Sequence, residues 1–129
     1  MKRVLVNTAR PYSVLIGSGA IAALPSELNH LTKARRLMIV SDTTVAPLHL
    51  ERVKELLSDR EVHTHVFPAG EEHKSMDSLL PLLTQLLEAG FDRSDMIVAL
   101  GGGVVGDMAG FAASMYMRGI DFVNIGSRV

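Results

Sequence analysis

The sequence predicts an α/β fold in which helices cover a mainly parallel β-sheet. Short apolar runs rich in Val, Ile and Leu alternate with longer amphipathic segments along most of the 129 residues, which is typical of βαβ units. The links between these segments are short, as in a single packed domain. Because no repeat, low-complexity tract or linker interrupts the pattern, we expect one domain over residues 1–129.

Each element follows from a local pattern. Two short β-type runs with a polar turn between them predict a hairpin at 3–6 and 12–16, and a short helix is expected at 20–31. Four further apolar runs predict strands, and three segments with apolar residues three or four positions apart predict helices. The strands are expected at 36–40, 62–67, 96–100 and 122–125, and the helices at 44–57, 78–89 and 104–117.

Proline and glycine refine the helix ends. Pro47 lies in the first turn of its helix, where a missing N–H is harmless. In the next helix Pro81 favours Ser78 over Ser75 as the N-cap, unless the helix kinks at the proline. Gly90 is expected to end that helix in the left-handed conformation.

Composition and charge exclude several classes of protein. Thirteen basic and fourteen acidic side chains give a net charge of -1, without the basic excess of a nucleic-acid-binding surface. No cysteine is present, which is compatible with a reducing cytoplasm. The N-terminus does not read as a signal peptide. The apolar stretch 96–117 contains Asp107 and a glycine triplet, so we expect a buried strand and helix there and no membrane partner.

Polar or glycine-rich loops follow three of the predicted strands, at 41–44, 68–74 and 101–107. In an open parallel sheet ligands bind beyond the carboxyl ends of the strands. We therefore expect these three loops to lie on one edge and to form the binding site.

The third loop opens a helix with the spacing G-x-G-x-x-G at Gly101, Gly103 and Gly106. The main-chain N–H groups of residues 103–106 are candidates to bind a pyrophosphate at the helix N-terminus. Asp107 occupies the position of the Walker A lysine and so excludes a P-loop. A carboxylate there should face a hydroxyl, an amide or a cation.

A packing explanation also applies to this helix. Gly106, Gly110 and Ala113 form a stripe of small residues that would let the helix approach the sheet, and we expect both packing and ligand contact. On the neighbouring loops, Asp42 is placed to accept hydrogen bonds from ribose hydroxyls. Glu71 and Lys74 lie three residues apart, which is also the pattern of an ordinary exposed ion pair.

Taken together, these segments resemble the 3-dehydroquinate synthase family. Its pattern G-E-x-x-K is matched at 70–74 and G-G-G-V-V-G-D at 101–107, followed by G-F at 110–111 and Y-x-R-G at 116–119. The opening hairpin and the segment SDTTVAPL are also similar, so the resemblance covers nearly the whole chain. It implies a Rossmann-like NAD-binding domain, the N-terminal portion of a two-domain enzyme whose C-terminal helical domain is absent.

The resemblance implies a lyase of the shikimate pathway, in aromatic amino-acid biosynthesis. Such an enzyme converts 3-deoxy-arabino-heptulosonate 7-phosphate to 3-dehydroquinate and phosphate, with NAD as a transient hydride acceptor and zinc or cobalt to polarise the oxidised carbon. The partner is a small sugar-acid phosphate, and the intact enzyme is expected to be a cytoplasmic homodimer. The implied cofactor-binding residues are Asp42, Ala69, Gly70, Glu71, Glu72, His73, Lys74, Gly103, Val104, Val105, Gly106 and Asp107.

By the same resemblance, Arg118 binds substrate across a dimer interface. An arginine at the carboxyl end of a helix is equally explained by the helix dipole.

The chain departs from the family at its end. The family's P-T-T is replaced by G-S-R-V at 126–129, and the later segment with the family's metal ligands is missing. His63 and His65 have suitable spacing for a metal, but we expect an edge strand and no metal site or catalytic residue in this chain. Alone, the fragment should bind NAD weakly and be inactive. Another sugar-phosphate cyclase, a metal-dependent alcohol dehydrogenase and a non-catalytic nucleotide-binding module remain alternatives.

Overall fold

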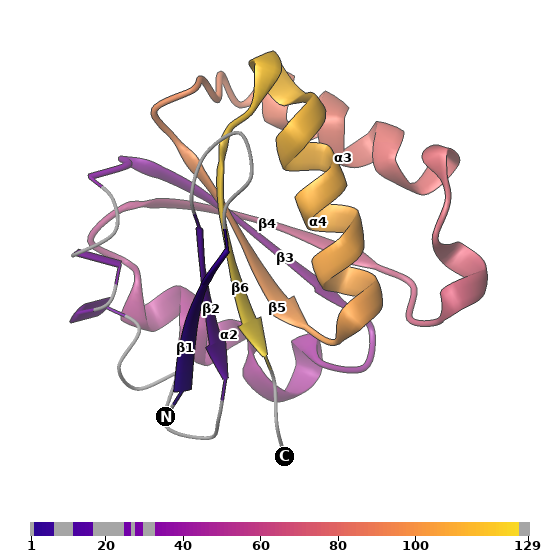
Figure 1. The fold of residues 1–129 in the computed structure, drawn as a ribbon, viewed down its shortest axis with the longest axis horizontal. Coiled ribbons are helices and arrows are strands. Elements are labelled where there is room, and N and C mark those ends of the chain that lie inside the picture. The colour runs from indigo at the N-terminus through magenta and orange to yellow at the C-terminus, as the bar shows by residue number, and fades with distance from the viewer. Residues whose placement is uncertain (1, 7–11, 17–24, 27, 30–32, 127–129) are drawn as a thin grey trace.

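A six-stranded sheet forms the centre of the computed structural model, which describes residues 2–6, 12–16, 25–26, 28–29 and 33–126. Strand β1 (Lys2–Val6) pairs antiparallel with β2 (Tyr12–Ile16). The sheet continues in the order β1-β2-β6-β5-β3-β4, and all pairings after the first are parallel (Figure 1). These strands are β3 (Arg36–Asp42), β4 (Glu61–Phe67), β5 (Met96–Gly101) and β6 (Asp121–Gly126). The predicted hairpin and Rossmann-like parallel sheet are confirmed.

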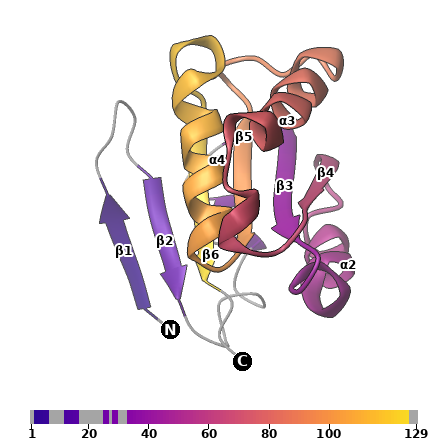
Figure 2. The ribbon, with the colours of Figure 1, turned by 90° about the vertical axis from the view of Figure 1, so that its right-hand side faces the viewer.

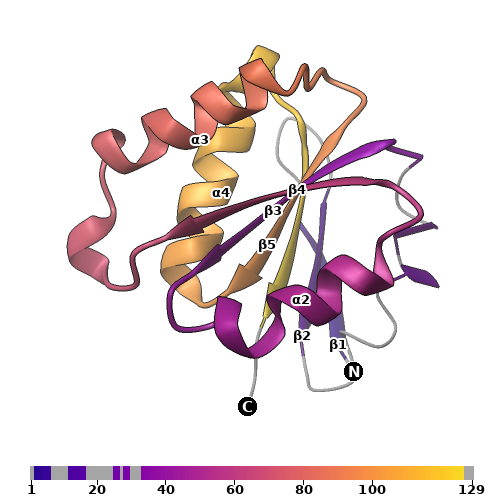
Figure 3. The same ribbon diagram turned by 180° about the vertical axis from the view of Figure 1, so that it is seen from behind.

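Helices cover both faces of this sheet. Helices α3 (Met76–Glu88) and α4 (Gly103–Met115) lie on one face (Figure 2), and α2 (Ala46–Leu56) lies on the other (Figure 3). Successive strand residues point to opposite faces, so β3 supplies Met38 and Val40 to the core under α3 and α4, and Leu37 and Ile39 to the core under α2. The alternation of strands and helices in the sequence therefore builds two cores on one sheet.

The start of α3 differs from the prediction. Ser75, not Ser78, is the N-cap, and its hydroxyl accepts a hydrogen bond from the Ser78 N–H at 3.3 Å. Pro81 lies inside the helix. The helix therefore begins before the proline, where the Ser75 cap and the buried Leu79 both support its first turn. Gly90 follows the helix with φ of 77°, as predicted.

Helix α4 also ends earlier than predicted. It stops at Met115 and is followed by a 3-10 turn, η2 (Tyr116–Arg118), in which Met117 and Arg118 have φ of 48° and 65°. The buried Tyr116 hydroxyl donates to the Phe91 carbonyl at 2.8 Å and fixes this turn. The reversal is needed because the chain must leave α4 and enter β6.

In the stretch 96–117 the strand is fully buried, as expected, whereas α4 is buried on one face only. Six of its 13 residues are buried, and Phe111 and Met115 are 54% and 40% exposed. Within the described ranges, no helix has the length and apolar character to cross a membrane. The predicted turn at 8–11 and the tail at 127–129 lie outside the described residues, as does most of the helix expected at 20–31.

Candidate functional site

Three loops meet at the carboxyl edge of the sheet. Asp42 at the end of β3 is in register with Phe67 at the end of β4, and Val40 is in register with Ala99 two residues before the end of β5. The first two loops are bonded to each other, since the Thr43 N–H donates to the Phe67 carbonyl at 3.0 Å and the Ala69 N–H to Thr43 Oγ1 at 2.9 Å. The predicted convergence is confirmed.

The glycine loop presents main chain at the start of α4. Gly102 is the N-cap, and the Gly106 N–H donates to the Gly102 carbonyl at 3.0 Å. Of the four candidate N–H groups at 103–106, that of Gly106 is therefore already engaged in the first helical hydrogen bond. The N–H groups of residues 103–105 have no partner within the described part of the chain, as in any first helical turn. Among the described residues, apart from chain neighbours and the backbone of the same helix, no atom lies within 4 Å of a Cβ built on Gly102 or Gly103. Open space therefore adjoins these two glycines.

Gly106 and Gly110 face β6, and the packing is tighter at Gly106. A Cβ on Gly106 would lie 2.6 Å from Asn124 Nδ2, and one on Gly110 would lie 3.3 Å from the Phe122 ring. Ala113, one turn further along, is buried. The predicted stripe of small residues is confirmed, and the open side of the loop lies at Gly102 and Gly103.

Asp107 faces a cation, one of the three partners expected for it. Its Oδ2 lies 2.8 Å from Lys74 Nζ, and Glu71 Oε1 lies 3.8 Å from the same ammonium group. The hydrogen bond to Asp107 raises the pKa of Lys74 above its ordinary value of 10.5. This exposed ion pair joins the loop after β4 to the first turn of α4, and the ammonium partly neutralises a carboxylate that would otherwise repel a phosphate.

Asp42 has one carboxylate oxygen engaged. Its Oδ1 accepts hydrogen bonds from the N–H groups of Thr44 and Val45 at 2.9 and 2.8 Å, which fixes the turn before α2. Its Oδ2 has no hydrogen-bond partner in the described ranges. Asp42 can therefore keep its structural role and still accept a hydrogen bond from a ligand hydroxyl.

The loop after β4 is a turn with an exposed tip. Gly70 has φ of 119°, and a Cβ there would lie 2.5 Å from the Glu72 carboxylate. Residues Glu71–His73 form the 3-10 turn η1, in which no residue is buried. Ala69 and Gly70 are half-buried beside Thr43. The loop therefore presents its main chain and three polar side chains to solvent at the carboxyl edge.

Arg118 does not join these residues within one chain. It follows the carboxyl end of α4, whose amino end holds the glycine loop. A helix of 13 residues is about 20 Å long, so the two positions lie at opposite edges of the sheet.

The histidines of β4 behave as edge-strand residues. β4 lies at the edge of the sheet, His63 bonds to Glu61, and His65 Nδ1 lies 2.9 Å from Gln85 Oε1. Where the structure describes the chain, no three His, Cys, Asp or Glu side chains are placed to hold a metal ion.

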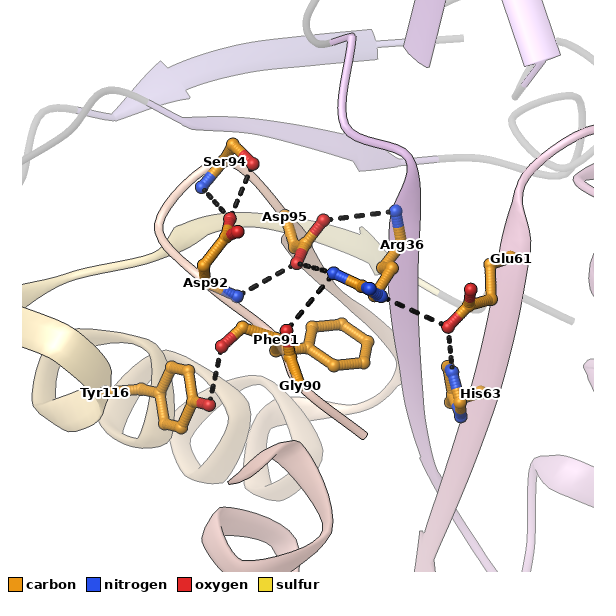
Figure 4. Close-up of polar contacts among 9 residues, drawn as sticks. All are labelled: Arg36, Glu61, His63, Gly90, Phe91, Asp92, Ser94, Asp95 and Tyr116. Carbon is orange, nitrogen blue, oxygen red and sulfur yellow. Dashed lines mark hydrogen bonds and ion pairs between the residues drawn. The ribbon is translucent and has the colours of Figure 1, made fainter. Parts of the chain in front are cut away.

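A polar network at the amino edge of the sheet was not predicted (Figure 4). Asp95 is 2% exposed and accepts from the N–H groups of Arg36 and Asp92 at 3.2 and 2.9 Å. The Arg36 guanidinium lies 3.5 Å from Asp95 and 3.2 Å from Glu61, and His63 bonds to Glu61 at 2.8 Å. The hydrogen bond with His63 lowers the pKa of Glu61. This network fastens the starts of β3, β4 and β5 away from the three loops.

Asn124 was also missed, although a lone amide within the apolar run FVNI is a visible signal. Its Oδ1 is buried and has no hydrogen-bond partner in the described residues, and its side chain packs against Gly106.

The family model and a curated relative both indicate 3-dehydroquinate synthase. The 3-dehydroquinate synthase N-terminal family matches residues 64–129. The 3-dehydroquinate synthase of Geobacillus kaustophilus is 44% identical over 97% of this chain. The chain spans 35% of that relative's length.

Two solved structures share the fold. A 2-deoxy-scyllo-inosose synthase complexed with carbaglucose-6-phosphate, NAD+ and Co2+ superposes with a TM-score of 0.81 at 26% identity, covering 97% of this chain and 35% of that one. The 2-epi-5-epi-valiolone synthase of Streptomyces hygroscopicus, with NAD+ and Zn2+ bound, gives 0.73 at 30% identity over 95% of this chain and 34% of that one. The chain belongs to the 3-dehydroquinate synthase N-terminal family.

Proposed function

We propose that this chain is the cofactor-binding domain of a 3-dehydroquinate synthase. The observation that carries the proposal is the meeting of the Asp42 carboxylate, the turn at 69–74 and the open main chain of the glycine loop at one edge of the sheet. The 44% identity to a 3-dehydroquinate synthase over nearly the whole chain supports the specific reaction.

The site fits NAD at three points. Asp42 and Glu71 would accept hydrogen bonds from the ribose hydroxyls of the adenosine half. The N–H groups of Gly103, Val104 and Val105 would bind the pyrophosphate, which the helix dipole also favours. Gly106 contributes by allowing α4 to approach Asn124, not by its own N–H.

The rest of the second loop would surround the cofactor. Lys74 and Asp107 would lie beside its polar edge, with Asp107 toward the nicotinamide ribose. The main chain of Ala69 and Gly70 and the side chains of Glu72 and His73 would complete the rim. Because Lys74 and Asp107 already form an ion pair, binding has to accommodate or replace that contact.

In the proposed reaction the substrate is 3-deoxy-arabino-heptulosonate 7-phosphate. Bound NAD would supply a reversible hydride acceptor, so that a neighbouring C–H becomes acidic enough for elimination of phosphate and no net oxidation results. This chain's residues would bind and orient the dinucleotide and exclude water from its pyrophosphate.

The described residues do not provide a site for the zinc or cobalt ion that the activity requires. We therefore assign no reaction step involving metal to these residues. The proposal places the metal ligands and most of the substrate pocket outside these 129 residues, and it predicts that the domain alone is inactive.

The intact protein is proposed to be a cytoplasmic homodimer. Arg118 is exposed at the edge opposite the glycine loop, so a role for it in substrate binding requires a second subunit. The dimer therefore has to bring Arg118 of one subunit to the cofactor site of the other.

A second candidate is another sugar-phosphate cyclase. It is favoured by the TM-score of 0.81 to the 2-deoxy-scyllo-inosose synthase. The two candidates share the cofactor site and differ in substrate, so only the substrate distinguishes them.

Two measurements on the full-length protein test the proposal. Isothermal titration with NAD+, NADP+ and ATP should show preference for NAD+, and preference for ATP or no dinucleotide binding would refute it. Phosphate release should then be measured with NAD+ and zinc or cobalt, using 3-deoxy-arabino-heptulosonate 7-phosphate and, in parallel, glucose 6-phosphate. Release from the first substrate supports the synthase, and release only from the second supports the other cyclase.

A further inference from the structure

In the part of the chain that the structure describes, Asn124 Oδ1 is the one buried side-chain oxygen or nitrogen without a hydrogen-bond partner. The residue lies in β6 between Val123 and Ile125, which point into the core under α2, whereas Phe122 belongs to the core under α4. Its Oδ1 is buried without a partner, and neither amide atom forms a hydrogen bond within the described ranges. A buried amide oxygen without a donor is unfavourable, so a donor from outside the described chain is expected.

Its place in the sheet suggests where that donor comes from. Asn124 is in register with Ala99 of β5, so it lies one strand along from the glycine loop that follows β5. Its Nδ2 would be 2.6 Å from a Cβ on Gly106, which puts the carboxamide against the first turn of α4. Asn124 as a whole is of intermediate exposure, although its Oδ1 is buried.

A role for Asn124 in cofactor binding rests on the proposed function. If the adenosine half lies over β3 and β4 beside Asp42 and Glu71, and the pyrophosphate lies at the start of α4, the nicotinamide half must continue over β6. We infer that the Asn124 carboxamide binds the carboxamide of the nicotinamide ring. Two primary amides are complementary, because each offers one oxygen acceptor and two N–H donors. The terminal torsion of asparagine is broad, which lets the amide turn its oxygen and nitrogen toward the ligand.

A purely structural role predicts a different outcome. If Asn124 only supports α4 through Gly106, its loss should weaken every ligand of the glycine loop alike. If it binds the nicotinamide, only ligands that contain this ring should be affected. ADP-ribose has the adenosine, pyrophosphate and second ribose of NAD+ but lacks nicotinamide, so it separates the two roles.

The test is calorimetric titration of the full-length protein with NAD+ and with ADP-ribose. Asn124→Leu, which keeps the approximate size of the side chain, should weaken NAD+ binding by about threefold to tenfold, the usual effect of one neutral hydrogen bond. ADP-ribose binding should be unchanged. The matched control is Phe122→Leu, which alters packing under Gly110 on the same strand face and should affect both ligands equally or not at all.

Equal loss of both ligands in Asn124→Leu, or unchanged NAD+ binding, would overturn the inference. Should this variant not fold, the wild-type protein can be titrated with 3-acetylpyridine adenine dinucleotide, in which a methyl group replaces the amide NH2. Weaker binding of this analogue than of NAD+ supports the inference, and equal binding overturns it. If the wild type binds ADP-ribose and NAD+ equally, only the inference fails, whereas absence of binding for both also refutes the proposed function.

Discussion

Gly106→Ala tests how closely α4 must approach the sheet. The new Cβ would lie 2.6 Å from Asn124 Nδ2, closer than side-chain atoms approach one another, so the amide or the helix has to shift. At Gly110 the nearest atom to a new Cβ is a Phe122 ring carbon at 3.3 Å, which needs a shift of only a few tenths of an ångström. The two glycines lie one turn apart in the same helix and form a matched pair.

The magnitudes follow from two opposing effects. Alanine stabilises a helix interior by about 1 kcal/mol relative to glycine, and overpacking a close contact costs about 1–3 kcal/mol. We expect Gly106→Ala to lower the free energy of unfolding by about 0–2 kcal/mol. Gly110→Ala should be neutral or stabilising by up to about 1 kcal/mol, because its overlap is smaller. Removing the obstructing amide with Asn124→Ala should make Gly106→Ala favourable.

The assay is urea denaturation of the full-length wild type and the three variants of this cycle (Gly106→Ala, Asn124→Ala and the double variant), with Gly110→Ala as control. We expect a coupling energy of at least about 1 kcal/mol between positions 106 and 124, in the range typical of residues in contact. If Gly106→Ala is as stable as Gly110→Ala, and the coupling is below about 0.5 kcal/mol, the packing explanation for Gly106 is refuted.

Three further predictions concern other parts of the structure. Asp95→Ala should lower the free energy of unfolding by about 1.5–3 kcal/mol, because a hydrogen-bonded buried carboxylate is lost. Chemical denaturation measures this change. A value below about 0.5 kcal/mol, the limit for ordinary surface sites, would contradict the prediction. Asp42→Ala should raise the apparent KM for NAD+. Asp42→Asn keeps an oxygen for the turn before α2, so it separates the loss of charge from the loss of the cap. An unchanged apparent KM for NAD+ in both variants refutes the ribose contact. The pKa values of Glu61 and Asp92 are lowered on folding by hydrogen bonds with His63 and Ser94. Their contribution to stability is therefore present above the ordinary values of 4.5 and 3.8 and lost as pH falls through the lower folded values. Because the pKa of Lys74 is raised, its contribution to stability is present below pH 10.5 and lost as pH rises through the folded value. A thermal midpoint that stays constant with pH on both the acidic and the alkaline side would contradict these assignments.

The sequence predicted the order of elements because each depends on local patterns. Three such patterns can be recognised without tertiary information. They are the Val, Ile and Leu runs of the strands, the proline in the first turn of α2, and Gly90 after α3. The position of the site was also predictable, since parallel strands place the loops that follow them on one edge.

What the sequence did not predict depends on contacts between distant residues. The pairing of Lys74 with Asp107 joins positions 33 residues apart, and several partners were chemically possible for each. The network around Asp95 links residues at the starts of three strands. Taken singly, none of these segments has a sequence pattern that indicates a polar network. Gly106 illustrates the same limit, because its spacing matched a phosphate-binding motif while its N–H is used within the helix.

Hydrogen–deuterium exchange on the full-length protein with and without saturating NAD+ tests the central claim most directly. The account predicts that NAD+ slows exchange in residues 41–45, 68–75 and 101–107, and leaves the amino edge around Arg36 and Asp95 unchanged. Slowed exchange confined to that amino edge, or no change in the three loops under conditions where NAD+ is bound, would contradict it.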